Sequence, residues 1–271
     1  EEILKGYDNI EPLDNFTSIE DVWYEKNSLK FKKDNKYGLI TYEGNQLLAP
    51  EYDNIYTLKG LERSIILKKD GKVGLYNNIA KDIILEPIYT EIKPLGNTYN
   101  DGYIVKSENK KYGIIGPDKK VILEPIYDKV YNIFGDSIYL VKKDNNTVIV
   151  DNNGEVKTEI NDNEKVSEIN GNDSIVFIKN KKYGIMDIEK KVLIKNKYDY
   201  IEHATGNYYI AKKGKKYGII DIKDTEKIEF KYQNITYRTD GTFIECENND
   251  YTTDLYNSDC EYKVTGTISE V

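Results

Sequence analysis

The chain has 271 residues, and its 39 basic and 47 acidic side chains give a formal net charge of −8. Hydrophobic residues make up 39% of it and tyrosine contributes 25 residues, so a folded core can form although the sequence reads as polar. The absence of any run of about 18 apolar residues excludes a transmembrane helix. Arginine is scarce and no basic segment is contiguous, which argues against nucleic-acid binding.

The first segment reads as a short strand followed by an irregular stretch. Tyr7-Asp8-Asn9-Ile10 has the composition of a strand. Residues 13–30 contain the only tryptophan, Trp23, and we expect an enlarged loop with a strand here. Next comes Lys36-Tyr37-Gly38, a tripeptide that returns at residues 111–113, 182–184 and 216–218. The chain is therefore built from copies of one motif.

The second unit shows the strands that we expect in every copy. Short apolar runs alternate with Asp, Asn, Gly and Lys clusters, which is typical of strands and turns. Four strands are predicted, at residues 52–57, 64–69, around 72–74, and 82–86. The turn Lys69-Asp70-Gly71-Lys72 between the second and third strands contains residues that tolerate positive φ. Nothing in the unit has helical spacing.

The third copy is complete, and later copies are partly degenerate. Lys111-Tyr112-Gly113 is followed by an apolar pair, a turn and a run that contains Pro125-Ile126-Tyr127-Asp128. Degenerate copies at Thr147-Val148 and Tyr251-Thr252 fill the remaining places. The anchor positions 38, 74, 113, 148, 184, 218 and 252 are separated by 34 to 39 residues. A period in this range indicates a repeat architecture.

Residues 1–271 are predicted to form a single all-β domain of seven units, each of about 36 residues. The first strand is of the tyrosine-aspartate type, and the last, Cys260 to Val264, is of the type that normally precedes it. We therefore expect a seven-bladed β-propeller of four-stranded blades, in which the amino-terminal strand completes the final sheet. A β-solenoid or stacked-hairpin array is the alternative.

Packing between neighbouring sheets is expected to come from the repeated Ile, Leu and Tyr positions, with Lys, Asp and Glu facing outward. Each fully buried Ile contributes about 1.5–3 kcal/mol. The glycine of the tripeptide is predicted to permit a close backbone approach or a bulge.

These residues carry a family resemblance. The order of Lys, aromatic residue, Gly, two apolar residues, polar turn, apolar run and Pro-x-Tyr-Asp resembles the bacterial WG-repeat (KWG-repeat) proteins, whose repeats usually carry Trp before the glycine. Tyr37, Tyr112, Tyr183 and Tyr217 occupy that place here, and Val73 departs further. The resemblance spans residues 7 to 264 and implies no shared activity, ligand or cofactor.

Residues with catalytic chemistry are sparse. His203 is the only histidine, so a histidine ligand set is excluded and a role in a loop or on a sheet surface is expected. No phosphate loop, zinc-spaced set or nucleophile elbow is present. Asp151-Asn152-Asn153-Gly154 lacks the ligand register of an EF-hand, so a hairpin turn is favoured over a calcium site. No catalytic, cofactor or metal residue is predicted.

Ligand contacts are expected among aromatic residues that break the repeat, namely Trp23, Tyr24, Tyr99 and Tyr103. The lysines beside the turns between second and third strands, such as Lys68 and Lys69, would gather on one face of a ring and form a basic crown for a polyanion. The alternative is that they are solvated turn residues, partly neutralised by acids such as Glu51, and we favour it.

The two cysteines, Cys246 and Cys260, are predicted on strands separated by a third, about 10 Å apart, and are therefore expected to be free thiols. The chain begins without methionine, and Met186 is the only one, so we expect a removed signal or anchor or a trimmed chain. The Lys, Asn, Ile and Tyr bias suggests a bacterial source. A secreted or cell-surface location is expected, with the cytoplasm as the alternative.

Two function classes follow. The first is a non-enzymatic binding or scaffold protein, expected to be monomeric, that engages a protein or glycan partner at the bacterial cell surface without a cofactor. The alternative is a glycan-acting hydrolase or lyase with a carboxylate-lined axial funnel, where two acids would lie at glycosidase separation. We favour the first class, so no enzymatic activity is predicted.

Overall fold

The computed structural model describes residues 6–13, 28–238 and 243–267, with only the backbone of residue 62. These residues form strands and turns, as predicted. Trp23 and Tyr24, two of the predicted ligand contacts, lie outside the described residues. The described segments contain no helix of the length and apolarity that a membrane crossing requires.

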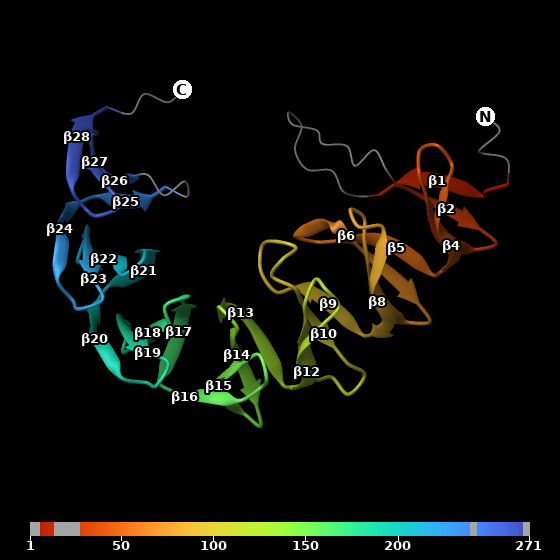
Figure 1. Ribbon diagram of the computed structural model, residues 1–271, viewed down its shortest axis with the longest axis horizontal. Coiled ribbons are helices and arrows are strands. Elements are labelled where there is room, and N and C mark those ends of the chain that lie inside the picture. Colours follow the sequence, from red (N-terminus) through yellow and green to blue (C-terminus); the bar gives the residue numbers. More distant parts are fainter. Residues whose placement is uncertain (1–5, 14–27, 239–242, 268–271) are drawn as a thin grey trace. The chain divides into compact units, whose positions relative to one another are not determined.

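The strands form seven four-stranded antiparallel sheets, each built from four consecutive strands of the chain (Figure 1). This is the blade pattern of a seven-bladed β-propeller, as predicted, and the sheets are called blades 1 to 7 in chain order. The strands are β1 (Asn9–Pro12), β2 (Leu29–Lys33), β3 (Lys36–Ile40) and β4 (Gln46–Tyr52) in blade 1; β5 (Asn54–Leu58), β6 (Leu61–Lys69), β7 (Lys72–Asn77) and β8 (Asp82–Tyr89) in blade 2; β9 (Glu91–Pro94), β10 (Tyr103–Lys106), β11 (Tyr112–Ile115) and β12 (Val121–Tyr127) in blade 3; β13 (Lys129–Gly135), β14 (Ile138–Lys143), β15 (Asn146–Asp151) and β16 (Val156–Ile160) in blade 4; β17 (Glu164–Ile169), β18 (Ser174–Lys179), β19 (Lys182–Asp187) and β20 (Val192–Tyr198) in blade 5; β21 (Tyr200–Thr205), β22 (Tyr208–Lys213), β23 (Lys216–Asp221) and β24 (Glu226–Tyr232) in blade 6; and β25 (Asn234–Tyr237), β26 (Phe243–Glu247), β27 (Thr253–Asn257) and β28 (Tyr262–Gly266) in blade 7.

One strand-pairing prediction is wrong. The amino-terminal strand β1 pairs with β2 of its own sheet, Asn9 lying opposite Lys32. The last sheet contains four strands of its own, β25 to β28. Each blade is therefore completed by four consecutive strands of the chain.

The contacts divide the chain into two compact units. Unit 1 consists of residues 1–132 and 141–145, and unit 2 of residues 133–140 and 146–271. The division falls inside blade 4. In unit 1, buried Tyr52 and Ile55 belong to one apolar cluster although they lie in consecutive blades. In unit 2, buried Tyr198 of blade 5 and Ile201 of blade 6 likewise belong to one apolar cluster. Burial across successive blades therefore holds each unit together.

The glycine of the tripeptide lies opposite a bulge, which confirms the predicted close approach. In blade 6, Tyr217 faces Tyr232 and Ile219 faces Ile228, so the fourth strand has two extra residues where Gly218 sits. A Cβ on Gly218 would lie 2.7 Å from the carbonyl oxygen of Ile228. Any larger residue here would collide with the bulged strand.

Blades 4 and 7 lack both the glycine and this bulge. Val148 faces Glu159 in regular register. In blade 7, the Gln233 amide donates to the Glu247 carbonyl as Asp199 does to Lys212. In this register Cys246 of blade 7 corresponds to Ala211 of blade 6, which faces Gly218. Cys246 faces Asp254, so Asp254 occupies the glycine position, and not Thr252 as predicted. The glycine is therefore required only where the fourth strand bulges.

Candidate functional site

Three blades are joined to the next by the same polar contact. The ammonium of the tripeptide lysine binds the aspartate that begins the following blade, at 2.5 Å in each of three pairs: Lys36–Asp53, Lys111–Asp128 and Lys182–Asp199. The second carboxylate oxygen accepts a hydrogen bond from a backbone amide of the next turn in two of these aspartates. Asp53 accepts from Asp70, and Asp199 accepts from Gly214, both at 2.7 Å. Beside it, a tyrosine of the third strand faces a tyrosine of the fourth, as Tyr37 faces Tyr52. We call the lysine–aspartate contact and this tyrosine pair together the standard junction.

Electrostatics fix the protonation of these aspartates. The hydrogen bond from Lys36 holds the pKa of Asp53 below its ordinary value, aided by the Asp70 amide. The same lysine contact lowers the pKa of Asp199. These carboxylates are therefore structural anions, and their geometry assigns them no proton-transfer role.

Lysines of the expected basic crown are also engaged locally. The Lys69 ammonium binds Glu51 at 2.8 Å, as the neutralised alternative requires. The ammonium groups of Lys106 and Lys212 lie 5.0 and 4.7 Å from the ring centres of Tyr112 and Tyr217. Such contacts are worth about 0.5–1 kcal/mol at exposed sites. Lys69, Lys106 and Lys212 therefore contact side chains of the blades themselves.

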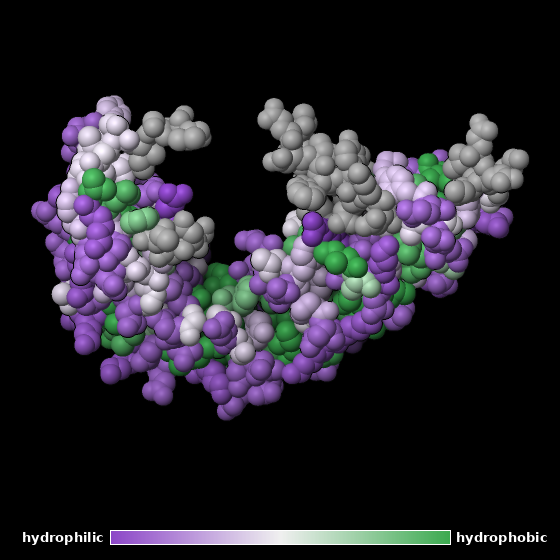
Figure 2. Space-filling model, turned by 45° about the horizontal axis from the view of Figure 1, so that its top comes forward, coloured by the Kyte–Doolittle hydropathy of each residue, from purple (hydrophilic) through white to green (hydrophobic). Residues whose placement is uncertain are grey.

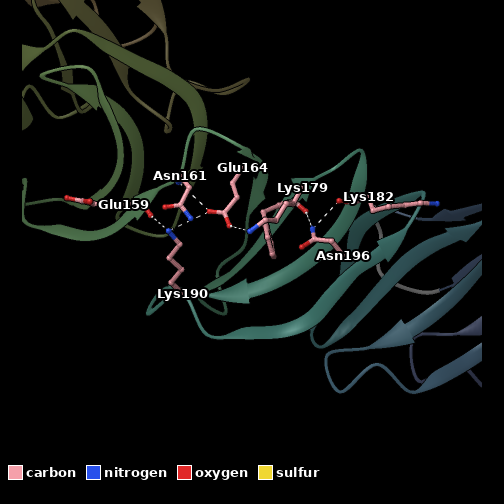
Figure 3. A network of polar contacts seen from close by, with 8 residues as sticks. Glu159, Asn161, Glu164, Lys179, Lys182, Lys190 and Asn196 are labelled. Atoms are coloured by element: carbon pink, nitrogen blue, oxygen red, sulfur yellow. Dashed lines mark hydrogen bonds and ion pairs between the residues drawn. The ribbon is translucent and has the colours of Figure 1, made fainter.

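The junction between blades 4 and 5 keeps the acid but changes its partners. Glu164 stands where the repeat has aspartate, while blade 4 carries Asn146 in place of the tripeptide lysine. Figure 3 shows the Glu164 carboxylate between Lys179, at 3.2 Å, and Lys190, at 3.6 Å. Burial would raise the pKa of Glu164, but the Lys179 hydrogen bond and the Asn161 amide hold it below its ordinary value. Both carboxylate oxygens of Glu164 are therefore engaged at this altered junction.

The junction between blades 2 and 3 departs from the standard in three ways. Val73 faces Tyr89, whereas the corresponding positions in blades 1, 3, 5 and 6 pair two tyrosines, as Tyr37 and Tyr52 do. Thr90 replaces the aspartate, and its hydroxyl donates to the Lys106 carbonyl at 3.2 Å. The following turn is one residue longer, since five residues separate Lys106 from its partner Tyr112 and four separate Lys68 from Val73.

These changes open a groove of about 320 Å³, which we call the junction groove. Ile115 and Leu123 form its buried floor, 3% and 2% exposed, while Ile88 and Val121 stand 57% and 44% exposed on its walls. On the face drawn in Figure 2, apolar side chains (green) reach the surface between hydrophilic ones (purple). The groove is lined by Ile88, Tyr89, Ser107, Glu108, Asn109, Ile115, Val121, Leu123, Glu124 and Pro125.

The substitutions explain why the groove lies here. Tyr52 and Tyr127, the counterparts of Tyr89, are each 2% exposed, whereas Tyr89 is only partly buried. Lys72, which has no aspartate at this junction, binds Glu108 of the longer turn at 2.6 Å. Burial and the charge of Glu124 raise the pKa of the Tyr89 hydroxyl. The groove therefore combines aliphatic walls, a neutral phenol and an acidic rim.

Tyr99 and Tyr103 are the two predicted ligand contacts that lie among the described residues. Tyr103 is 1% exposed, and its hydroxyl lies 2.9 Å from the Ser64 hydroxyl, so its ring is part of the core. Tyr99 accepts a hydrogen bond from the Arg63 amide at 3.0 Å and packs on the core. Neither residue lines the junction groove.

The sequence did contain a signal for the groove. The residue between proline and tyrosine is Ile88 in blade 2 and Ile126 in blade 3, but Glu51 in blade 1. The interval of 39 residues between Gly74 and Gly113 is also the longest of the series. The elongated unit marks this junction, whereas the exposed isoleucine is shared with the standard junction between blades 3 and 4.

The remaining candidate groups have structural surroundings. His203 Nε2 lies 2.9 Å from the Gly206 carbonyl, and its ring meets Tyr209 edge-on. Within the described ranges, no cluster of three or more His, Cys, Asp or Glu residues is suited to hold a metal ion. Cys246 and Cys260 are free thiols, as predicted, and burial raises the pKa of Cys260 to about 11.

Comparisons with known proteins agree with the repeat. Residues 37–72, 112–146 and 183–217 match the family described as WG containing repeat. No curated protein matches the chain. Among solved structures, a eukaryotic initiation factor is 8% identical over 93% of this chain and 78% of that one, with a TM-score of 0.48.

Two Hsv2 structures are similar at the same level. The protein from Kluyvelomyces marxianus is 11% identical over 75% of this chain and 71% of that one, with a TM-score of 0.38. The Kluyveromyces lactis protein is 9% identical over 96% and 98%, with a TM-score of 0.37. Likenesses this distant carry no argument about function.

Proposed function

Because the chain carries WG repeats and one of its altered junctions opens into a groove, we propose that it is a non-enzymatic binding protein that engages a protein partner through the junction groove. The observation that carries this proposal is the convergence of Val73, Thr90 and the lengthened turn on one place. Elsewhere in unit 1, the same positions close the junction with a tyrosine pair and an ion pair.

A protein partner fits the lining better than a glycan does. Sugars are commonly held against exposed aromatic faces, whereas the exposed walls here are Ile88 and Val121. Aliphatic walls around a small concave site suit an apolar side chain of a polypeptide. The expected secreted or cell-surface location in a bacterium would place the groove among extracellular protein partners, and it remains a prediction.

Selection from a random peptide library displayed on phage tests this function. Wild-type protein is expected to enrich peptides whose binding is lost in Val121→Lys, because the lysine places a charge on the groove wall. Val192→Lys is the matched control: Val192 is 50% exposed at the same first position of the fourth strand in blade 5. Equal loss in both variants would contradict a groove-specific site.

A second arm separates the other function classes. The purified protein is applied to a glycan array and incubated with bacterial polysaccharides. Glycan binding that survives Val121→Lys, with no peptide enriched, would replace the protein partner by a glycan. Turnover of a polysaccharide would overturn the non-enzymatic assignment and favour the hydrolase or lyase alternative.

A further inference from the structure

We infer that the junction groove selects a polypeptide segment in which an aliphatic side chain is next to a lysine or arginine. The inference rests on the proposed function and adds the chemistry of the partner. The aliphatic side chain would contact Ile88, Val121 and the Leu123 floor, and the cation would face the acidic rim.

The size of the groove limits what can enter. A volume of about 320 Å³ is at the lower end of the ~300–1,000 Å³ typical of ligand pockets. One or two side chains are therefore accommodated, and the rest of the partner stays on the rim. This is the geometry of a side-chain anchor in a pocket.

Recognition by strand addition is disfavoured at this place. The exposed edges of β8 and β12 contain Pro87 and Pro125, which have no backbone amide hydrogen to donate. Both strands also carry the bulge opposite their glycines, Gly74 and Gly113. An incoming strand would meet an interrupted ladder, so side chains must supply most of the binding.

The charge on the rim is negative and only partly neutralised. Lys72 binds Glu108, whereas no ion pair is found for Glu124 among the described residues. Two lysines of the same blade are engaged elsewhere: Lys111 binds Asp128 at 2.5 Å and Lys119 binds Asp82 at 2.6 Å. Glu124 is exposed and lines the groove beside Tyr89. A cation on the partner would therefore find an available carboxylate.

The composition of the phage-selected peptides tests the inference. Wild-type protein is expected to enrich an aliphatic residue beside lysine or arginine, and Glu124→Lys to enrich an aliphatic residue beside aspartate or glutamate. Glu86→Lys is the matched control, since Glu86 holds the same place before proline in β8 and does not line the groove. Its selection should match that of wild type.

Affinity measurements give the size of the effect. Replacing the basic residue of a selected peptide by glutamine should weaken binding to the wild type about two- to five-fold at low salt. The same replacement should leave the affinity for the Glu124→Gln variant unchanged. The difference in affinity between the two peptides for the wild type should shrink at high salt.

The outcomes separate the inference from the proposed function. Peptides that depend on Val121 but show no basic preference, or one that Glu124→Lys leaves unchanged, would overturn the inference and keep the groove as a binding site. Peptides that bind Val121→Lys as well as wild type would overturn both.

Discussion

The junctions on either side of blade 2 have the same strand pairing but different side-chain contacts. Between blades 1 and 2, Tyr37 faces a buried Tyr52, and Lys36 binds Asp53. Between blades 2 and 3, valine and threonine replace the tyrosine and aspartate, and a longer turn supplies Glu108. The blades pair in the same way in both places. The ion pair is therefore dispensable for the fold, and its loss exposes a surface for recognition.

Both junctions retain the glycine, and substituting it has the largest expected effect. A Cβ on Gly74 would lie 2.7 Å from Pro87 N and 2.8 Å from the Glu86 carbonyl carbon. Gly74→Ala should therefore destabilise the protein by about 1–3 kcal/mol, measured by urea unfolding. Gly266→Ala in β28 is the control, because nothing lies within 4 Å of a Cβ there. Equal costs would show that the bulge does not require the glycine.

The standard junction should contribute to acid sensitivity. Lysine contacts lower the pKa values of Asp53, Asp128 and Asp199. Their contribution is present above the ordinary carboxyl pKa, about 3.9, and is lost as pH falls through the depressed folded values.

Urea midpoints measured at neutral pH and at about pH 3 test this acid sensitivity. The triple variant Asp53→Asn, Asp128→Asn and Asp199→Asn should lose less stability on acidification than wild type. An unchanged acid response would mean that the junction aspartates have the same pKa values in the folded and unfolded chain.

Restoring the standard residue at the altered junction should have the smallest effect. Thr90→Asp would offer Lys72 a carboxylate where Lys36 finds Asp53, and should raise the melting temperature by about 1–2 °C. Adding Glu108→Gln should leave this gain intact, because Lys72 would have changed partners. A loss of stability would show that the longer turn is incompatible with the ion pair.

The repeat made most of the fold predictable from sequence. The period, the four strands of each unit and the role of the glycine follow from local patterns, and the structure confirms them. The last anchor was misplaced by two residues, because Tyr251-Thr252 imitates the motif while backbone pairing selects Asp254. Local resemblance cannot set strand register when the glycine is missing.

The site was harder to predict because it depends on residues far apart in sequence. Val73, Thr90 and Glu108 are each unremarkable substitutions, and only their meeting at one junction opens the groove. The aromatic residues Tyr99 and Tyr103 did not indicate the groove, since Tyr103 lies in the core and neither residue lines the groove. The long interval between Gly74 and Gly113 was the better signal.

Hydrogen–deuterium exchange with a phage-selected peptide tests the central claim most directly. Binding at the junction groove predicts slower exchange in the lengthened turn, residues 107–111, and in residues 121–125 of β12, with no change at the equivalent turn, residues 69–72. Protection confined to other blades, with residues 107–125 unchanged, would contradict the account.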